Sequence, residues 1–324
     1  MNFYIKGYYG YKNFGDEMLI FGLLNYIEKN ITTTSPERTQ QKHYYIEVQD
    51  PQRMQTRMQR NKELLDFPLE KICYVPIQQD KYKWITHLKT FLGRSKYRRM
   101  TKIFGGGELF DAKKSFPHNG RNLLILYFYT VFRKNFYLVG GIGQTDTIRQ
   151  KILQKMLISR AKQVICRDRT SYQRAKKYAQ SHTGKDEKPQ DDNILLYHDF
   201  SFDVCPAGSQ RQLSPSNKTI LLNAPYSKLL EKYITPYRSK DTKLLFFPCE
   251  YTEDKKYFAS LQQHFPQIQS YDWTQYPLIA TLKIFAKARC GVGKRLHFCL
   301  PLYHYKVPYF CVEKNDKQKK LLGE

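Results

Sequence analysis

The sequence predicts an α/β protein in which two doubly wound parallel sheets face a central cleft. One observation is the entry unit, where a short strand at 3–6 leads through a glycine-rich loop into apolar residues at helical spacing. A second is that predicted strands and helices alternate along most of the chain. A third is that the alternation restarts at Thr219, after a Pro-, Gly- and Ser-rich stretch. Such alternation is typical of parallel sheets with helices on both faces.

Length and composition agree with two domains of ordinary size. The chain has 324 residues, 41% hydrophobic and 26% charged, which is a globular composition. We expect an N-terminal Rossmann-like domain at 1–205, a linker at 206–217 and a C-terminal Rossmann-like domain at 218–324.

Each domain is expected to contain its own set of strands and helices. In the first, strands are predicted at 3–6, 44–48, 73–77, 101–104, 136–139, 164–166 and 195–202, and helices at 18–27, 123–132 and 148–162, with one more that ends at Tyr178. In the second, strands are predicted at 219–223, 243–248, 268–271 and 307–312, and helices at 229–237, 254–264 and 278–288.

Glycines gather where three of the predicted strands end, at 7–15, 105–107 and 140–143. Consecutive glycines are poor for regular structure, and they let a backbone approach a ligand closely. Ligands of open α/β sheets bind at this edge, so these loops are candidate binding loops. None has the G-x-G-x-x-G spacing of a dinucleotide site.

Charged residues follow several of the same strands. Asp16 lies where a general base would sit, although a carboxylate there can also simply favour the N-terminus of a helix. Arg167 and Asp168 follow the strand at 164–166. Asp199 lies in the last predicted strand of the first domain.

Arg295 and His297 lie two residues apart after a glycine pair. On a strand or tight turn this spacing puts both side chains on one face, whereas on a helix they would diverge by about 200°. A fixed cation beside a group that titrates near neutrality suits an anionic substrate that gains or loses a proton. The alternative is a surface arginine and a structural histidine, and the tripeptide alone favours that alternative.

The net charge of +25 calls for anionic partners. The basic residues are dispersed and no nucleic-acid motif is present, so we expect no specific nucleic-acid binding. The basic stretch 82–100 is interpreted as a solvated face rather than a lipid-binding helix, which leaves peripheral contact with an anionic membrane open. The sequence carries no signal for the number of subunits.

Cysteine spacing and apolar runs bear on the compartment. The seven cysteines lack C-x-x-C spacing, so neither a disulfide framework nor a metal site is expected. The N-terminus has no signal-peptide core, and the longest apolar run, 123–132, is about half of a membrane span. We therefore expect a cytoplasmic protein.

Taken in order, these motifs resemble the polysaccharide pyruvyl transferase family. The resemblance covers nearly the whole chain and is carried by Tyr8-Tyr9-Gly10, Asn13–Glu17, Phe104–Gly107, Gly140–Gly143, Arg167-Asp168 with Ser171, Asp199, and Arg295-Leu296-His297. It implies a GT-B-like fold. It also implies transfer of pyruvate from phosphoenolpyruvate to sugar hydroxyls of a cell-surface polysaccharide or its precursor, as a ketal. No cofactor is implied besides phosphoenolpyruvate as co-substrate, and the implied acceptor is a saccharide or lipid-linked saccharide.

That chemistry suggests roles for the candidate residues. The donor's methylene carbon must gain a proton, which we assign to His297, and Asp16 is the candidate base for the attacking hydroxyl. Arg295 and Arg167 would clamp the anionic donor, with Asp168 orienting Arg167. The other residues expected to line the site are Asn13, Gly15, Gly106, Gly107, Gly141 and Gly143.

Two other functions stay open at this point. One is a nucleotide-sugar glycosyltransferase of the GT-B type, which the lack of a dinucleotide fingerprint does not exclude. The other is a non-catalytic basic protein that binds an acidic polymer, which the net charge of +25 supports.

Overall fold

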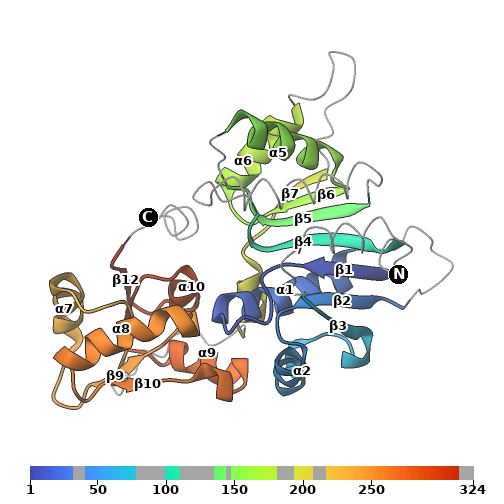
Figure 1. Cartoon of the computed structure of the whole chain (residues 1–324). Coiled ribbons are helices and arrows are strands. Elements are labelled where there is room, and N and C mark those ends of the chain that lie inside the picture. Colours follow the sequence, from blue (N-terminus) through green and yellow to red (C-terminus); the bar gives the residue numbers. More distant parts are fainter. Residues whose placement is uncertain are drawn as a thin grey trace. The chain divides into compact units, whose positions relative to one another are not determined.

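The structure is a computed structural model that describes residues 1–31, 41–77, 99–109, 135–143, 147–180, 193–206 and 217–313 (Figure 1). The predicted helix at 123–132, most of the basic stretch 82–100 and most of the linker 206–217 lie outside these residues. Within them the fold is mixed α/β with two parallel sheets, as predicted.

The first sheet has seven strands in the order β3-β2-β1-β4-β5-β6-β7, and every neighbouring pair is parallel. Its strands are β1 (Asn2–Lys6), β2 (His43–Val48), β3 (Ile72–Pro76), β4 (Thr101–Glu108), β5 (Phe136–Gly141), β6 (Gln163–Cys166) and β7 (Ile194–Leu196). From β1 the chain adds β2 and β3 on one side of the sheet and then returns to add β4 to β7 on the other side. This change of direction at β1 is the doubly wound topology.

The described residues between these strands include several helices. They are α1 (Phe14–Asn30), α2 (Pro51–Arg60), α5 (Ile148–Arg160) and α6 (Arg169–Gln180), with short 3₁₀ turns η1 (Lys62–Leu64), η2 (Leu69–Lys71) and η5 (Phe200–Val204). The prediction of a strand over 195–202 is wrong beyond Leu196. Phe200, Ser201 and Val204 are buried whereas Phe202 is only half-buried, and this spacing is helical because an alternating strand would bury Phe202 in place of Ser201.

The second sheet has five parallel strands in the order β10-β9-β8-β11-β12. Its strands are β8 (Thr219–Asn223), β9 (Lys243–Phe246), β10 (Gln269–Ser270), β11 (Cys290–Gly293) and β12 (Tyr309–Cys311). Its helices are α7 (Lys228–Ile234), α8 (Tyr251–His264), α9 (Leu278–Ala286) and α10 (Leu296–His304), with 3₁₀ turns η6 (Thr235–Tyr237) and η7 (Trp273–Gln275).

The chain divides into two compact units, each with one of the sheets. The first contains Met1–Tyr9, Tyr26–Gln55 and Phe67–Asp199, and the second contains Gly10–Asn25, Thr56–Asp66 and Phe200–Glu324. This division differs from a single cut at 206–217, because two segments from the N-terminal part of the sequence belong to the unit with the C-terminal sheet.

Phe14 shows why the first of these segments belongs there. Its ring is fully buried and packs against three aromatic rings of the second unit: Phe247, Trp273 and Phe285, with centroids 4.9, 5.6 and 5.7 Å away. Burying a phenylalanine side chain contributes roughly 1.5–3 kcal/mol, and aromatic pairs add to it. Phe14 therefore anchors the start of α1 to this unit.

Arg57 holds the second segment. Its Nε donates to Glu17 Oε2 at 2.8 Å, and its Nη1 donates to the carbonyl oxygens of Thr274 and Tyr276 at 3.1 and 2.7 Å. The guanidinium also lies over the Trp273 ring, with its Cζ 5.4 Å from the centroid. Both Arg57 and Glu17 are buried, so each depends on the other for charge compensation.

In the part of the chain that the structure describes, no helix combines the length and apolar character that a membrane crossing requires. All seven cysteines are free thiols, and all but the half-buried Cys73 are buried.

Arg57→Met should lower the free energy of unfolding by about 3–5 kcal/mol, because it breaks the buried ion pair between Arg57 and Glu17. Arg60→Met is a matched control, since Arg60 also donates to the Thr274 carbonyl but is only half-buried. It should cost about 1 kcal/mol or less. Urea unfolding monitored by tryptophan fluorescence measures both, and equal losses would contradict the role given to the buried ion pair.

Candidate functional site

The Arg-Leu-His tripeptide lies where β11 passes into α10. Arg295 is the N-cap of α10, with extended backbone, and His297 lies in the first helical turn. The expectation that both side chains share a face of a strand or tight turn is therefore wrong. After Arg295, the buried residues Leu296, Cys299 and Leu300 lie at i, i+3 and i+4, a spacing that favours a helix.

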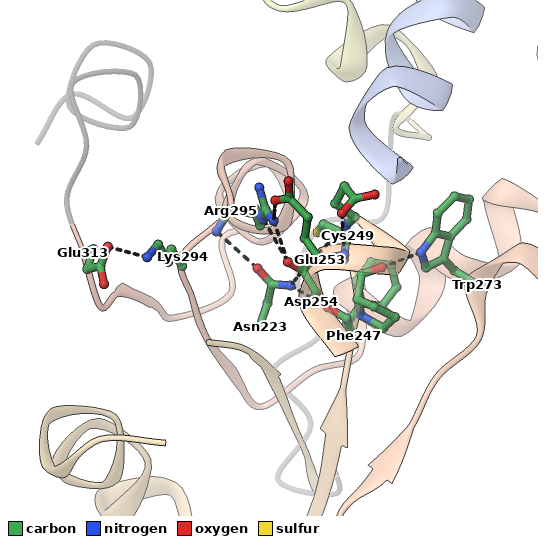
Figure 2. Close-up of polar contacts among 11 residues, drawn as sticks. Asn223, Phe247, Cys249, Glu253, Asp254, Trp273, Lys294, Arg295 and Glu313 are labelled. Atoms are coloured by element: carbon green, nitrogen blue, oxygen red, sulfur yellow. Dashed lines mark hydrogen bonds and ion pairs between the residues drawn. The ribbon is translucent and has the colours of Figure 1, made fainter. Parts of the chain in front are cut away.

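The Arg295 guanidinium is held by two carboxylates at the start of α8 (Figure 2). Its Nε and Nη2 donate to Asp254 Oδ1 at 3.0 and 2.7 Å, and Nη2 also donates to Glu253 Oε2 at 2.7 Å. Burial by itself would lower the pKa of Arg295, but the hydrogen bond to Glu253 and the charge of Asp254 raise that pKa above its usual value. The side chain is therefore a permanent cation.

Asp254 is fully buried and organises the surrounding backbone (Figure 2). Its Oδ2 accepts hydrogen bonds from Asn223 Nδ2 at 3.0 Å and from the backbone N–H groups of Cys249 and Glu250 at 2.9 and 3.0 Å. Asn223 Oδ1 in turn accepts from the backbone N–H of Arg295 at 3.2 Å. One carboxylate thus joins the ends of β8 and β11 and the loop after β9.

The N-terminal motif joins this arrangement through its backbone. The Phe14 N–H donates to the Cys249 carbonyl at 2.8 Å, and the Tyr251 N–H donates to the Lys12 carbonyl at 3.0 Å. Asn13 lies between them and forms an antiparallel bridge with Glu250. The loop braced by Asp254 therefore also positions the start of α1.

The side chain of Asn13 caps α1. Its Oδ1 accepts from the backbone N–H groups of Gly15 and Asp16 at 3.1 and 3.4 Å, as an N-cap residue does. The cap fixes the first turn of α1, in which Asp16 is half-buried and Glu17 is buried.

Gly15 packs directly against His297. A Cβ atom on Gly15 would lie 2.0 Å from His297 Nδ1 and 2.8 Å from His297 Cβ, so no side chain fits there. The predicted residues Asn13, Gly15 and Asp16 therefore share one turn that lies beside the imidazole of His297.

The glycine loop at 140–143 belongs to the first unit and is fixed by α6. The Ile142 N–H donates to Ser171 Oγ at 2.9 Å, and that hydroxyl donates to Asp168 Oδ2 at 2.8 Å. Asp168 Oδ1 accepts from the Ser171 N–H at 2.7 Å, so Asp168 caps α6. Gln154 Nε2 donates to the Gly143 carbonyl at 3.0 Å, which fixes the end of the loop.

Arg167 lies across Gly141 in the same unit. A Cβ on Gly141 would be 3.0 Å from its Nε, and only 7% of Arg167 is exposed. Its nitrogens lie 3.8 Å from Asp168 Oδ2 and 3.7 Å from Asp199 Oδ2, too far for hydrogen bonds. Within the described residues its buried Nε makes no hydrogen bond. Such a guanidinium has donors left for an anion.

The adjoining glycines of β4 and β5 differ in the room around them. Among the described residues, a Cβ on Gly107 would meet no atom within 4 Å, whereas Gly140 has a φ of +124° and its Cβ would lie 2.3 Å from the Gly107 carbonyl oxygen. Gly105 to Glu108 contains a register shift against β5, and Gly106 lies within it. The open side of Gly107 is where a ligand could approach this loop.

The predicted residues thus form two groups. Asn13, Gly15, Asp16, Arg295 and His297 belong to the second unit, and Gly106, Gly107, Gly141, Gly143 and Arg167 belong to the first.

The sequence did not identify three polar residues that hold Arg295 in the structure: Asn223, Glu253 and Asp254. Asn223 ends a predicted strand, and position at a strand end is the signal that identified Arg167, so the same signal could have identified Asn223.

Among the described residues, no group of three or more His, Cys, Asp or Glu side chains could hold a metal ion.

Comparison with known proteins decides the family. The sequence profile of the polysaccharide pyruvyl transferases matches residues 58–313. The chain belongs to this family. The matched range includes Arg167, Arg295 and His297, and the Asn13–Asp16 turn precedes it. No curated protein sequence matches the chain significantly.

Solved structures with the same fold include three UDP-N-acetylglucosamine 2-epimerases. The enzyme from Rickettsia bellii is 9% identical with a TM-score of 0.58, and the alignment covers 98% of this chain and 80% of that chain. The Methanocaldococcus jannaschii enzyme is 10% identical (TM-score 0.59, 100% and 87% covered). The Neisseria meningitidis enzyme, bound to UDP-GlcNAc, is 7% identical (TM-score 0.59, 100% and 85% covered). The likeness shows a GT-B-like fold with Rossmann-like domains.

Gly15→Ala should lower the free energy of unfolding by about 1–3 kcal/mol, the usual cost of overpacking, because the new methyl group collides with the His297 ring. In a His297→Ala background the two closest ring atoms are gone, so the added cost should fall. A double-mutant cycle by denaturant unfolding measures this coupling. Additive effects would show that the two residues do not pack as described.

Gly140→Ala should destabilise the first unit by about 1–3 kcal/mol, because alanine is strained at a positive φ and its methyl group meets the Gly107 carbonyl. Gly107→Ala should change stability by no more than about 0.5 kcal/mol, because its Cβ meets none of the described residues within 4 Å. Thermal unfolding of the two variants tests the contrast, and a larger loss for Gly107→Ala would contradict it.

Proposed function

We propose that this family member transfers pyruvate from phosphoenolpyruvate to saccharide hydroxyls of a cell-surface polysaccharide or its precursor, forming a cyclic ketal and releasing phosphate. The observation that carries the proposal is the contact between His297, in the first turn of α10, and Gly15, in the first turn of α1. This contact puts the imidazole beside the turn that contains Asp16, and His297 lies two residues after the permanent cation Arg295 in the chain.

The reaction needs a proton at one carbon and a nucleophile at its neighbour. A proton added to C3 of phosphoenolpyruvate turns the methylene into a methyl group and leaves C2 electron-poor. One sugar hydroxyl oxygen bonds to C2, the C2–O bond to phosphate breaks, and a second hydroxyl closes the ketal. Of the two hydroxyl protons, one balances the proton gained by C3 and the other leaves with the phosphate.

His297 is the proposed donor of the proton to C3, since an imidazole can act as a general acid and be reprotonated between turnovers. Asp16 is the proposed base for the attacking hydroxyl. Arg295 would bind a carboxylate or phosphate group of the donor, which the N-terminal end of α10 also favours, because no side chain in the described structure caps it. Arg167 is proposed as a second group that binds the anionic donor. The glycines at 106, 107, 141 and 143 are proposed to contact the substrates.

The acceptor would be a saccharide or a lipid-linked saccharide. In the second case the net charge of +25 would favour contact with an anionic membrane surface, and a cytoplasmic location at the inner face of the membrane would follow. A nucleotide-sugar glycosyltransferase and a non-catalytic binding protein are the alternatives that the assay below must separate.

The test is phosphate release from phosphoenolpyruvate in the presence of an oligosaccharide mixture, with the product examined by mass spectrometry for a pyruvyl ketal. Phosphate release that depends on the acceptor supports the proposal. Consumption of a nucleotide sugar in place of phosphoenolpyruvate would indicate a glycosyltransferase, and saccharide binding without turnover would indicate a binding protein.

Two substitutions should fail in different ways. His297→Ala should leave phosphoenolpyruvate affinity nearly unchanged and lower the single-turnover rate roughly 10²–10⁴-fold, as expected for loss of a general acid. Arg295→Lys keeps the charge but loses the planar fork, so it should weaken donor binding more than it slows the chemical step.

Calorimetry of donor binding and rapid-quench single turnovers measure the two effects separately. Full single-turnover rate in His297→Ala would exclude His297 as the acid. We prefer Arg295→Lys to an alanine substitution because alanine would leave the buried Asp254 carboxylate without a counterion.

A further inference from the structure

We infer that the neighbours Asp254 and Glu253 have different tasks at Arg295: Asp254 is a positioning residue that fixes the guanidinium, and Glu253 is an exchangeable counterion that an anionic group of the substrate displaces. The inference deepens the proposed function and rests on it, since it takes Arg295 as the group that binds the donor. Both carboxylates contact the same nitrogen, Arg295 Nη2, at 2.7 Å (Figure 2).

Displacing the Asp254 carboxylate from Arg295 would cost much free energy. Its side chain has no solvent exposure, and both of its oxygens accept hydrogen bonds. Moving it would leave the Asn223 amide and the Cys249 and Glu250 N–H groups without their acceptor. The carboxylate is therefore a fixed part of the fold, and the guanidinium is oriented by it.

Glu253 has the opposite character. Its side chain is 64% exposed, and among the described residues its carboxylate accepts a hydrogen bond from Arg295 and also interacts with the charge of Lys256. The hydrogen bond with Arg295 lowers the pKa of Glu253, so the group is anionic at neutral pH. Exposed ion pairs contribute little to stability, because water replaces either partner easily. Moving the Glu253 carboxylate away from Arg295 therefore breaks no other hydrogen bond of that carboxylate in the described structure.

The geometry of the guanidinium decides what a substrate must displace. A guanidinium presents five N–H groups in a plane, and Nη2 carries two of them. Asp254 Oδ1 accepts from Nε and Nη2, so it occupies the fork on the Nε side. Glu253 then takes the second Nη2 hydrogen, which belongs to the fork shared with Nη1.

That second fork is what remains for a bidentate anion. A carboxylate or phosphate that binds Arg295 through two parallel hydrogen bonds needs both Nη1 and Nη2. Glu253 occupies one of these positions with the same chemical group, a carboxylate. Substrate binding therefore competes with Glu253, and the competition should cost affinity but not rate.

Glu313 provides a matched control for removing one exposed carboxylate. Glu313 Oε2 lies 2.6 Å from the Nζ of Lys294, the residue before Arg295 in the chain. The Glu313 side chain is 62% exposed. Glu313→Gln and Glu253→Gln change the net charge equally, but only the second frees the Arg295 fork. A difference between them reports on displacement rather than on long-range electrostatics.

The experiment compares Glu253→Gln, Glu313→Gln and Asp254→Asn by calorimetry with phosphoenolpyruvate, together with kcat and KM for the donor. Glu253→Gln should bind the donor about two- to fivefold more tightly than Glu313→Gln, as expected from the strength of an exposed ion pair. Asp254→Asn should raise the donor Kd roughly 10–100-fold, since the orienting charge is lost.

Equal donor affinity in the two glutamine variants would overturn the role of Glu253. An unchanged donor Kd in folded Asp254→Asn would overturn the role of Asp254. Should that variant fail to fold, Asn223→Ser removes one hydrogen bond from the same carboxylate and should raise KM for the donor. An unchanged KM would then count against the inference.

Failure of the proposed function gives a different pattern. If the unaltered chain neither binds phosphoenolpyruvate nor releases phosphate from it, that donor is rejected. Titration with inorganic phosphate then tests the arrangement of the carboxylates on its own. Tighter phosphate binding by Glu253→Gln than by Glu313→Gln supports displacement at Arg295, and equal binding overturns it.

Discussion

The second unit depends on one buried carboxylate, that of Asp254. It neutralises Arg295, accepts from Asn223 at the end of β8, and accepts from the backbone of the loop that follows β9. That loop pairs with the segment before α1, so the same contact also sets the entry into α1. A fully buried charge with several donors is costly to disturb, and this rigidity is what a site needs to hold its side chains in place.

In the first unit a carboxylate with fewer hydrogen bonds has a similar role. Asp168 caps α6 and, through the Ser171 hydroxyl, fixes the Ile142 amide of the glycine loop. In each unit an acidic residue early in a helix or at its N-cap braces a loop that follows a parallel strand. The two arginines differ, however. Arg295 has hydrogen bonds to carboxylates, whereas Arg167 lies near two carboxylates at ion-pair distance only.

The local sequence pattern predicted most of the strands and helices, because the periodicity of apolar residues within a short segment indicates whether that segment is a strand or a helix. It missed β11, whose sequence Cys-Gly-Val-Gly lacks the branched and aromatic residues typical of strands, although tight packing against Phe298 and Leu302 of α10 requires its glycines. The candidate residues were chosen by strand ends and motif resemblance. Their partners were not, since the contact of Arg295 with Asp254 spans 41 residues of sequence. The contact between Gly15 and His297 is equally invisible to any local window.

The interleaving of the two units has a consequence for how the chain is made. The backbone passes from one unit to the other after Tyr9, Asn25, Gln55, Asp66 and Asp199. A ribosome releases the start of α1 long before the aromatic residues that bury Phe14 exist. This apolar turn acquires the last of its native aromatic partners only once Phe285 has been synthesised. During vectorial synthesis the second unit therefore stays incomplete until nearly the whole polypeptide is available.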